Sequence, residues 1–216
     1  MLGTNHRYAD TPTFNYQAAG ARIVPDDGGI AVALSPVVWY GTSIVHGAAV
    51  TRAGESFTNR VSRGLNRTVY NFGFSGSGHM DVGIGTWLRK INASIFIVDC
   101  DWNMAAAEIA TKTGPYVRTI REMHPTTPIV LAEGSPSGDH WFLPAARQAQ
   151  DAKNAALRGA FEALRGSDPN LHYVNGTDLF GDDPTVNPTV GGCHPSDLGA
   201  HKIATFYTAF LPTLLQ

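Results

Sequence analysis

Short apolar segments recur along the chain, separated by longer stretches in which the apolar residues follow helical spacing. Each short segment is rich in Val and Ile and lacks the alternation of a half-exposed strand. Such segments are typical of strands that are buried on both faces. The pattern predicts five strands, at 37–40, 69–72, 95–98, 129–132 and 171–174.

The longer stretches predict helices at 55–65, 82–91, 105–123, 144–164 and 198–214. Leu157, Phe161 and Leu164 follow the i, i+4, i+7 spacing of an apolar helix face. Gly114-Pro115 predicts a break or kink in the third helix. Because strand and helix alternate five times, we expect a three-layer α/β/α sandwich of flavodoxin-like type with a five-stranded parallel sheet.

The first 36 residues do not follow this alternation. Two short apolar segments, 21–24 and 30–33, flank Pro-Asp-Asp-Gly-Gly, a sequence typical of a hairpin turn. We therefore expect a short N-terminal β extension at 1–36 and an α/β domain at 37–216. A length of 216 residues fits one domain with a small appendage.

Composition and charge indicate which kinds of partner, nucleic acid or membrane, the protein is expected to lack. Charged residues make up 16% of the chain, against about 25% in an average domain, and the net charge is −2. With basic residues scattered, we predict no nucleic-acid partner. The longest near-apolar run, 30–40, is far shorter than the ~18 residues of a membrane span, so we predict no membrane insertion. The N-terminus lacks the pattern of a signal peptide, which leaves a cytoplasmic protein or a mature secreted form without its leader.

Polar residues with catalytic chemistry follow the predicted strands. Ser43 follows the first strand, Gly76 the second and Asn103 the third, and His194 stands just before the last helix. The carboxyl ends of parallel strands meet at one edge of a sheet, where ligands bind. A nucleophile, a base and hydrogen-bond donors at one edge are the parts of an acyl-transfer site.

Each of these residues also has a structural interpretation. Ser43 and Asn103 could cap helices, Gly76 could serve a tight turn, and His194 could be a loop residue before a helix-starting proline. Taken together, their order and their places at strand ends favour a site.

The sequence predicts neither a metal nor a cofactor. No histidine pair has zinc-ligand spacing with supporting Cys, Asp or Glu. The run Gly-Phe-Ser-Gly-Ser-Gly lacks both the Lys-Ser/Thr ending of a P-loop and the dinucleotide fingerprint. Three further histidines, His46, His79 and His140, lie near strand ends, and His46 could line the pocket. Whether Cys100 and Cys193 pair stays open.

Four segments resemble the sequence blocks of the SGNH, or GDSL-type, serine hydrolases. Tyr-Gly-Thr-Ser-Ile-Val-His-Gly at 40–47 resembles the first block, in the branch with Gly-Thr-Ser, and the segments 71–76, 99–103 and 194–199 resemble the second, third and fifth blocks in the same order. The resemblance spans about 37–210. It implies a cofactor-independent esterase for small-molecule substrates with short acyl groups, acetyl groups on carbohydrates among them.

The resemblance also implies roles for individual residues. Ser43 matches the nucleophile and His194 the general base, while the N–H groups of Ser43 and Gly76 and the side chain of Asn103 match the oxyanion hole. A serine hydroxyl needs an adjacent base to act at neutral pH, and the tetrahedral oxyanion needs preorganised donors.

One position departs from the family pattern, which has Asp three residues before the histidine. Here that position is Gly191. The site could be a Ser-His dyad whose imidazole is oriented by a backbone carbonyl near Gly191, another acid (Asp182, Asp183 or Asp197) could substitute, or the change could be inactivating. We favour the dyad.

Two other functions remain open on the same residues. The chain could transfer an acyl group to an alcohol instead of water, or it could be a catalytically impaired binding protein that keeps the fold. Three aromatic residues in strand-end loops, Trp102, Trp141 and Phe142, could shape an acyl or sugar pocket or merely pack on the surface. The natural ester and the oligomeric state stay open.

Overall fold

The computed structural model describes residues 34–180 and 186–215. The hairpin expected at 21–33 lies outside these residues. Five strands lie where the sequence predicts them, and the first three extend one residue further. They are β1 (Val37–Gly41), β2 (Val69–Gly73), β3 (Ile95–Asp99), β4 (Ile129–Ala132) and β5 (Leu171–Val174).

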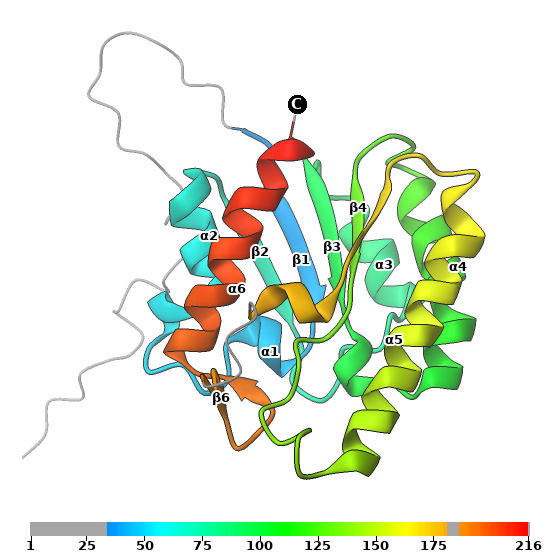
Figure 1. The fold of residues 1–216 in the computed structure, drawn as a ribbon. Helices are drawn as coiled ribbons and strands as arrows, with labels where there is room; N and C mark the ends of the chain where they lie inside the picture. Colours follow the sequence, from blue (N-terminus) through cyan, green and yellow to red (C-terminus); the bar gives the residue numbers. More distant parts are fainter. Residues whose placement is uncertain (1–33, 181–185, 216) are drawn as a thin grey trace, which may run out of the picture.

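The five strands form one parallel sheet in the order β2-β1-β3-β4-β5. This is the flavodoxin-like order, in which the chain reverses direction across the sheet at β1. Helices lie on both sides of the sheet (Figure 1). The predicted three-layer α/β/α fold is therefore confirmed.

Six helices and four short 3-10 turns connect the strands within the described residues. Their bounds are α1 Ser43–His46, α2 Phe57–Leu65, α3 Val82–Leu88, α4 Ala106–Arg121, α5 Pro144–Arg165 and α6 Asp197–Phe210, with turns η2 Ala53–Glu55, η3 Asp101–Asn103, η4 Gly176–Leu179 and η5 Leu211–Thr213. The helix predicted at 198–214 is thus α6 followed by η5. None of the described helices is long and apolar enough to cross a membrane.

Successive strand residues bury against opposite helix layers. Trp39 packs edge-on against Phe57 of α2 and Tyr207 of α6, while the next residue, Tyr40, stacks on Tyr116 of α4. All five rings are almost fully buried. The alternation explains why these strands are apolar throughout, since both faces are covered.

Of the break or kink predicted at Gly114-Pro115, the break is wrong, because α4 continues through Pro115. Proline removes one helical N–H bond, to the carbonyl of Thr111. Thr111 and Pro115 both lie on the exposed side of the helix. Water can therefore reach that carbonyl, while Tyr116, Val117 and Ile120 hold the helix on the sheet.

A small antiparallel hairpin precedes α6 and was not predicted. Its strands are β6 (Thr189–Val190) and β7 (His194–Pro195), with Val190 paired to His194. Gly191 and Gly192 both adopt positive φ, +58° and +77°, in the turn between the strands. In Figure 1 the hairpin lies beside α1 at the lower end of the molecule.

Candidate active site

The candidate nucleophile stands where β1 passes directly into α1. Thr42 is the N-cap of this one-turn helix, and its side-chain Oγ1 accepts a hydrogen bond from the Ile44 N–H at 3.2 Å. Ser43 is therefore the first residue of the helix rather than its cap. The capping interpretation of Ser43 is wrong, and its hydroxyl is left for another partner.

That partner is His194, although 151 residues separate the two in sequence. The Ser43 Oγ lies 2.9 Å from the His194 Nε2. In a neutral imidazole protonated on Nδ1, Nε2 accepts the hydroxyl hydrogen. Ser43 is only 9% exposed and β7 presents the histidine to it. The two residues thus have the geometry of a nucleophile and its base.

Asn103 is held in a defined orientation on η3, immediately after β3. Its side-chain oxygen accepts a hydrogen bond from the Gly78 N–H at 3.2 Å, which leaves the amide hydrogens to face elsewhere. Gly78 in turn packs against the backbone of Gly41 and Thr42, because a Cβ at position 78 would overlap both. The capping interpretation of Asn103 is wrong, since Ala105 is the N-cap of α4.

Gly76 lies in the loop between β2 and α3 with φ +69°. A Cβ at this position would meet no atom within 4 Å, so space does not require glycine here. The positive φ is what favours glycine. The His79 Nε2 contacts the Gly76 carbonyl at 3.2 Å and braces the loop.

Three donors expected to bind an oxyanion have no internal acceptor. Among hydrogen bonds within the described residues, none uses the N–H of Ser43, the N–H of Gly76 or the side-chain amide hydrogens of Asn103. These groups remain available to a ligand. Donors that are fixed but not engaged are what an oxyanion site needs.

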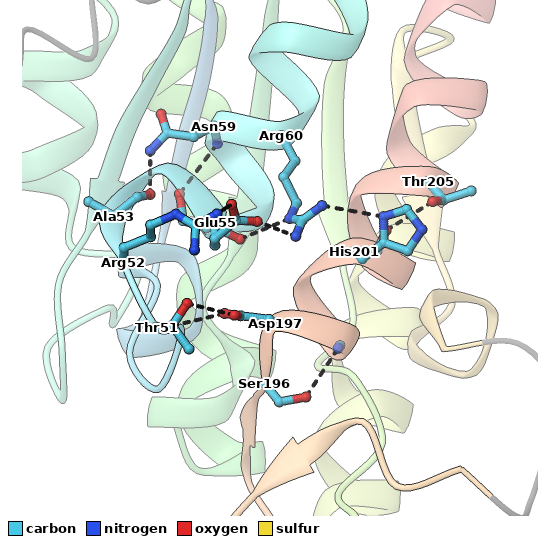
Figure 2. Close-up of polar contacts among 12 residues, drawn as sticks. Thr51, Arg52, Ala53, Glu55, Asn59, Arg60, Ser196, Asp197, His201 and Thr205 are labelled. Atoms are coloured by element: carbon cyan, nitrogen blue, oxygen red, sulfur yellow. Dashed lines mark hydrogen bonds and ion pairs between the residues drawn. The ribbon is translucent and has the colours of Figure 1, made fainter.

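The position of the missing acid, Gly191, has open space around it. A Cβ at Gly191 would meet nothing within 4 Å. Asp182 and Asp183 lie outside the described residues. The carboxylate of Asp197 is engaged by Thr51, since it accepts hydrogen bonds from the Thr51 N–H at 2.8 Å and the Thr51 hydroxyl at 2.6 Å (Figure 2).

The hydrogen bonds from Thr51 also hold the pKa of Asp197 below its usual range. The carboxylate therefore fastens the start of α6 to the segment after α1. The same segment carries the ion pairs of Glu55 with Arg52 and Arg60, and Arg60 reaches His201 of α6 (Figure 2). Asp197 thus has a structural role in the described residues.

Two buried acids at the end of β3 were not singled out from the sequence. Burial, with the nearby charge of Asp101, raises the pKa of Asp99 to about 8. Burial raises the pKa of Asp101 to about 6, although the Gly134 N–H donates to this carboxylate at 2.8 Å and the Gln150 side chain at 3.0 Å. Asp101 thereby ties η3, and with it Asn103, to the end of β4 and to α5. The sequence feature that could have identified Asp99 and Asp101 is their place in a polar segment at the end of a buried strand.

The histidine and aromatic residues considered as pocket-lining candidates make other contacts than with Ser43 or His194. His46 lines a cavity of about 480 Å³ with Asn59 and Asn71, and neither Ser43 nor His194 is part of its lining. Trp102 stacks on His140. Trp141 and Phe142 pack edge-on against each other and are 83% and 53% exposed.

Both cysteines are free thiols, Cys100 buried and Cys193 half-buried. Within the part of the chain that the structure describes, no group of three or more His, Cys, Asp and Glu residues is arranged to hold a metal ion.

Several proteins of known structure have a similar fold. A protein described as a GDSL-like lipase from Bacteroides ovatus superposes with a TM-score of 0.79 at 32% identity, covering 86% of this chain and 55% of that one. A salicylyl-acyltransferase from a tetracycline biosynthetic pathway gives 0.70 at 21%, covering 86% and 56%. A family two carbohydrate esterase from Clostridium thermocellum, in complex with cellohexaose, gives 0.65 at 15%, covering 84% and 64%.

The chain thus spans between about half and two thirds of the length of these proteins, and the two more distant ones show the fold alone. A comparison with curated proteins finds no significant match. The profile of the GDSL-like Lipase/Acylhydrolase family matches residues 35–212, nearly the whole described domain. The chain therefore belongs to the GDSL-like lipase/acylhydrolase family.

Proposed function

We propose that this protein is a serine esterase that hydrolyses short-chain carboxylic esters. The observation that carries the proposal is the 2.9 Å hydrogen bond between the Ser43 hydroxyl and the His194 Nε2. A serine with a base in this position can attack a carbonyl carbon, and the family match supports esterase chemistry.

The reaction has two halves. The Ser43 Oγ attacks the ester carbonyl carbon while Nε2 of His194 takes the hydroxyl proton. The oxyanion forms where the N–H groups of Ser43 and Gly76 and the amide of Asn103 can donate to it. The C–O bond to the alcohol then breaks, and the alcohol leaves with the proton from His194.

The second half releases the acid. His194 takes a proton from a water molecule, whose oxygen attacks the acyl carbon on Ser43. The bond to Ser43 Oγ breaks, the proton returns from His194 to that oxygen, and the carboxylic acid leaves. No cofactor takes part in either half. The imidazole acts without the Asp that the family pattern carries at position 191.

The proposed substrate is a short acyl ester, an acetyl group on a carbohydrate in particular. The carbohydrate esterase with cellohexaose shares the fold, and the exposed rings of Trp141 and Phe142 offer faces on which sugar rings can stack. Acetate release from an acetylated oligosaccharide, compared with release from p-nitrophenyl acetate, tests this narrower substrate class.

The first test is hydrolysis of p-nitrophenyl acetate by the wild type and by Ser43→Ala. Loss of the nucleophile should lower kcat by at least about 10³-fold, because little but binding and oxyanion stabilisation remains. Ser167→Ala, which changes an exposed serine at the end of α5, is the matched control and should keep full activity.

Equal rates in wild type and Ser43→Ala would reject the proposal. Binding of an ester without turnover would then favour the impaired binding protein. Formation of a new ester in the presence of an added alcohol would instead identify acyl transfer on the same residues.

A further inference from the structure

The loop between β4 and α5 is hydrogen-bonded to the turn that precedes His194. The Gly138 N–H donates to the Gly192 carbonyl at 2.8 Å. The Ser137 hydroxyl contacts both that carbonyl and the carboxylate of Asp139. We call Ser137, Gly138 and Asp139 the clamp.

The clamp and the hairpin meet without spare room. A Cβ on Gly192 would lie 2.6 Å from a carboxylate oxygen of Asp139. A Cβ on Gly138 would overlap the side chains of Asn187 and Thr189, at the start of β6. The hairpin therefore packs on the clamp at its turn and at the start of β6. At both places the backbone of a glycine lies directly against side chains of the other segment.

Asp139 stands beside the segment that leads directly into the candidate base. Gly192 and Cys193 are the two residues before His194. Burial, helped by the negative charge of Asp139, raises the pKa of the Cys193 thiol. Among the described acids, Asp197 is turned to Thr51, whereas Asp139 faces the turn that carries the histidine.

From these contacts we infer that Asp139 is a positioning residue for His194, acting through the Gly192–Cys193 turn where the family pattern uses an Asp at 191. The inference rests on the proposed function. Two consecutive glycines with positive φ make a turn with much conformational freedom in the absence of a partner. Since a displacement of about 1 Å at a catalytic group can lower a rate about 10²-fold, fixing this turn matters for the rate.

The first experiment measures kcat and KM for p-nitrophenyl acetate in Asp139→Ala, Asp139→Asn and the control Asp151→Ala. Asp139→Ala should lower kcat by about 10- to 100-fold with KM changed less than twofold. Asp139→Asn keeps an acceptor for Ser137 and should stay within about fivefold of wild type. Asp151 is exposed on α5 and its removal should change neither constant.

The second experiment adds Gly191→Asp to Asp139→Ala. Position 191 has open space, and Asp tolerates positive φ better than most residues. A carboxylate placed there can hold the imidazole directly, so it should restore kcat at least fivefold in the Asp139→Ala background and change the wild type less than threefold. Such a non-additive pair indicates a shared task.

Two results would overturn the inference. One is an Asp139→Ala enzyme with wild-type kcat. The other is a loss that Gly191→Asp does not rescue and that accompanies a lower midpoint of urea unfolding, which would make Asp139 merely structural. Wild-type turnover that survives Ser43→Ala is a separate outcome, and it would reject the esterase proposal and this role with it.

Discussion

The amide of Asn103 shows how a single contact sets the chemistry that a side chain can offer. Its oxygen is occupied by the Gly78 N–H. The nitrogen, with two hydrogens, is therefore the end of the amide that can face a developing negative charge. Gly78 itself packs directly against the backbone of Gly41 and Thr42. The orientation of Asn103 therefore depends on how Gly78 packs against the residues that precede Ser43.

Replacing Asn103 should consequently affect turnover more than binding. Asn103→Ala removes one oxyanion donor and should lower kcat for p-nitrophenyl acetate by about 10²- to 10³-fold, with KM little changed. Steady-state kinetics with a circular dichroism spectrum as a folding control test this. A rise in KM at constant kcat would show that Asn103 only binds the ground state.

At the scale of elements, α1 is held to the sheet by contact between backbones. A Cβ on Gly73, at the end of β2, would overlap the backbone of Val45 and His46 in α1. Gly41 and Gly73 are also paired residues at the ends of β1 and β2. Because α1 begins with Ser43, the place of the hydroxyl depends on this close approach.

Gly73→Ala should therefore damage both stability and activity. We expect a loss of about 1–3 kcal/mol in the free energy of unfolding from overpacking, together with a fall in kcat as α1 is displaced. Gly83→Ala is the matched control, since its Cβ would meet nothing within 4 Å inside α3. Urea unfolding of both variants tests this. Equal stability of the two would contradict a tight contact at Gly73.

Elements also differ in how well the sequence predicts them. The strands were placed within a residue because burial on both faces leaves short Val- and Ile-rich segments. By contrast, α1 and the β6–β7 hairpin are too short to carry a period, and their shape depends on neighbours far away in sequence. Ser43, Asn103 and His194 could be proposed from strand ends and motifs. The clamp at 137–139 could not, because its hydrogen bonds to Gly192 join segments far apart in sequence.

For the whole molecule, Asp99 links stability to pH. It ends the central strand β3, is 5% exposed, and has a pKa raised by burial to about 8. In the unfolded chain the same group ionises near pH 4. Between those values only the unfolded state loses its proton. The folded state therefore becomes progressively less stable as pH rises from about 4 to 8, by up to about 1.4 kcal/mol per pH unit.

Asp99→Asn removes this titration. The free energy of unfolding of the wild type, relative to the variant, should fall as pH is raised from 6 to 7.5. Asp101, whose pKa is about 6, is present in both proteins, so its own titration is common to the two curves. Urea unfolding of both proteins at matched pH values measures the difference. Parallel curves over this range would show that Asp99 is already ionised in the folded protein.

The separation of Ser43 and His194 by 151 residues has a consequence during synthesis. Ribosomes add about 5–20 residues per second, so the serine precedes the histidine by roughly 8 to 30 s. The strand β1 is already made when the interval begins, and the other four strands of the sheet, β2 to β5, are made within it. A nascent chain with an assembled sheet would thus carry an unactivated serine, and ester cleavage would report that the histidine hairpin has closed on the site.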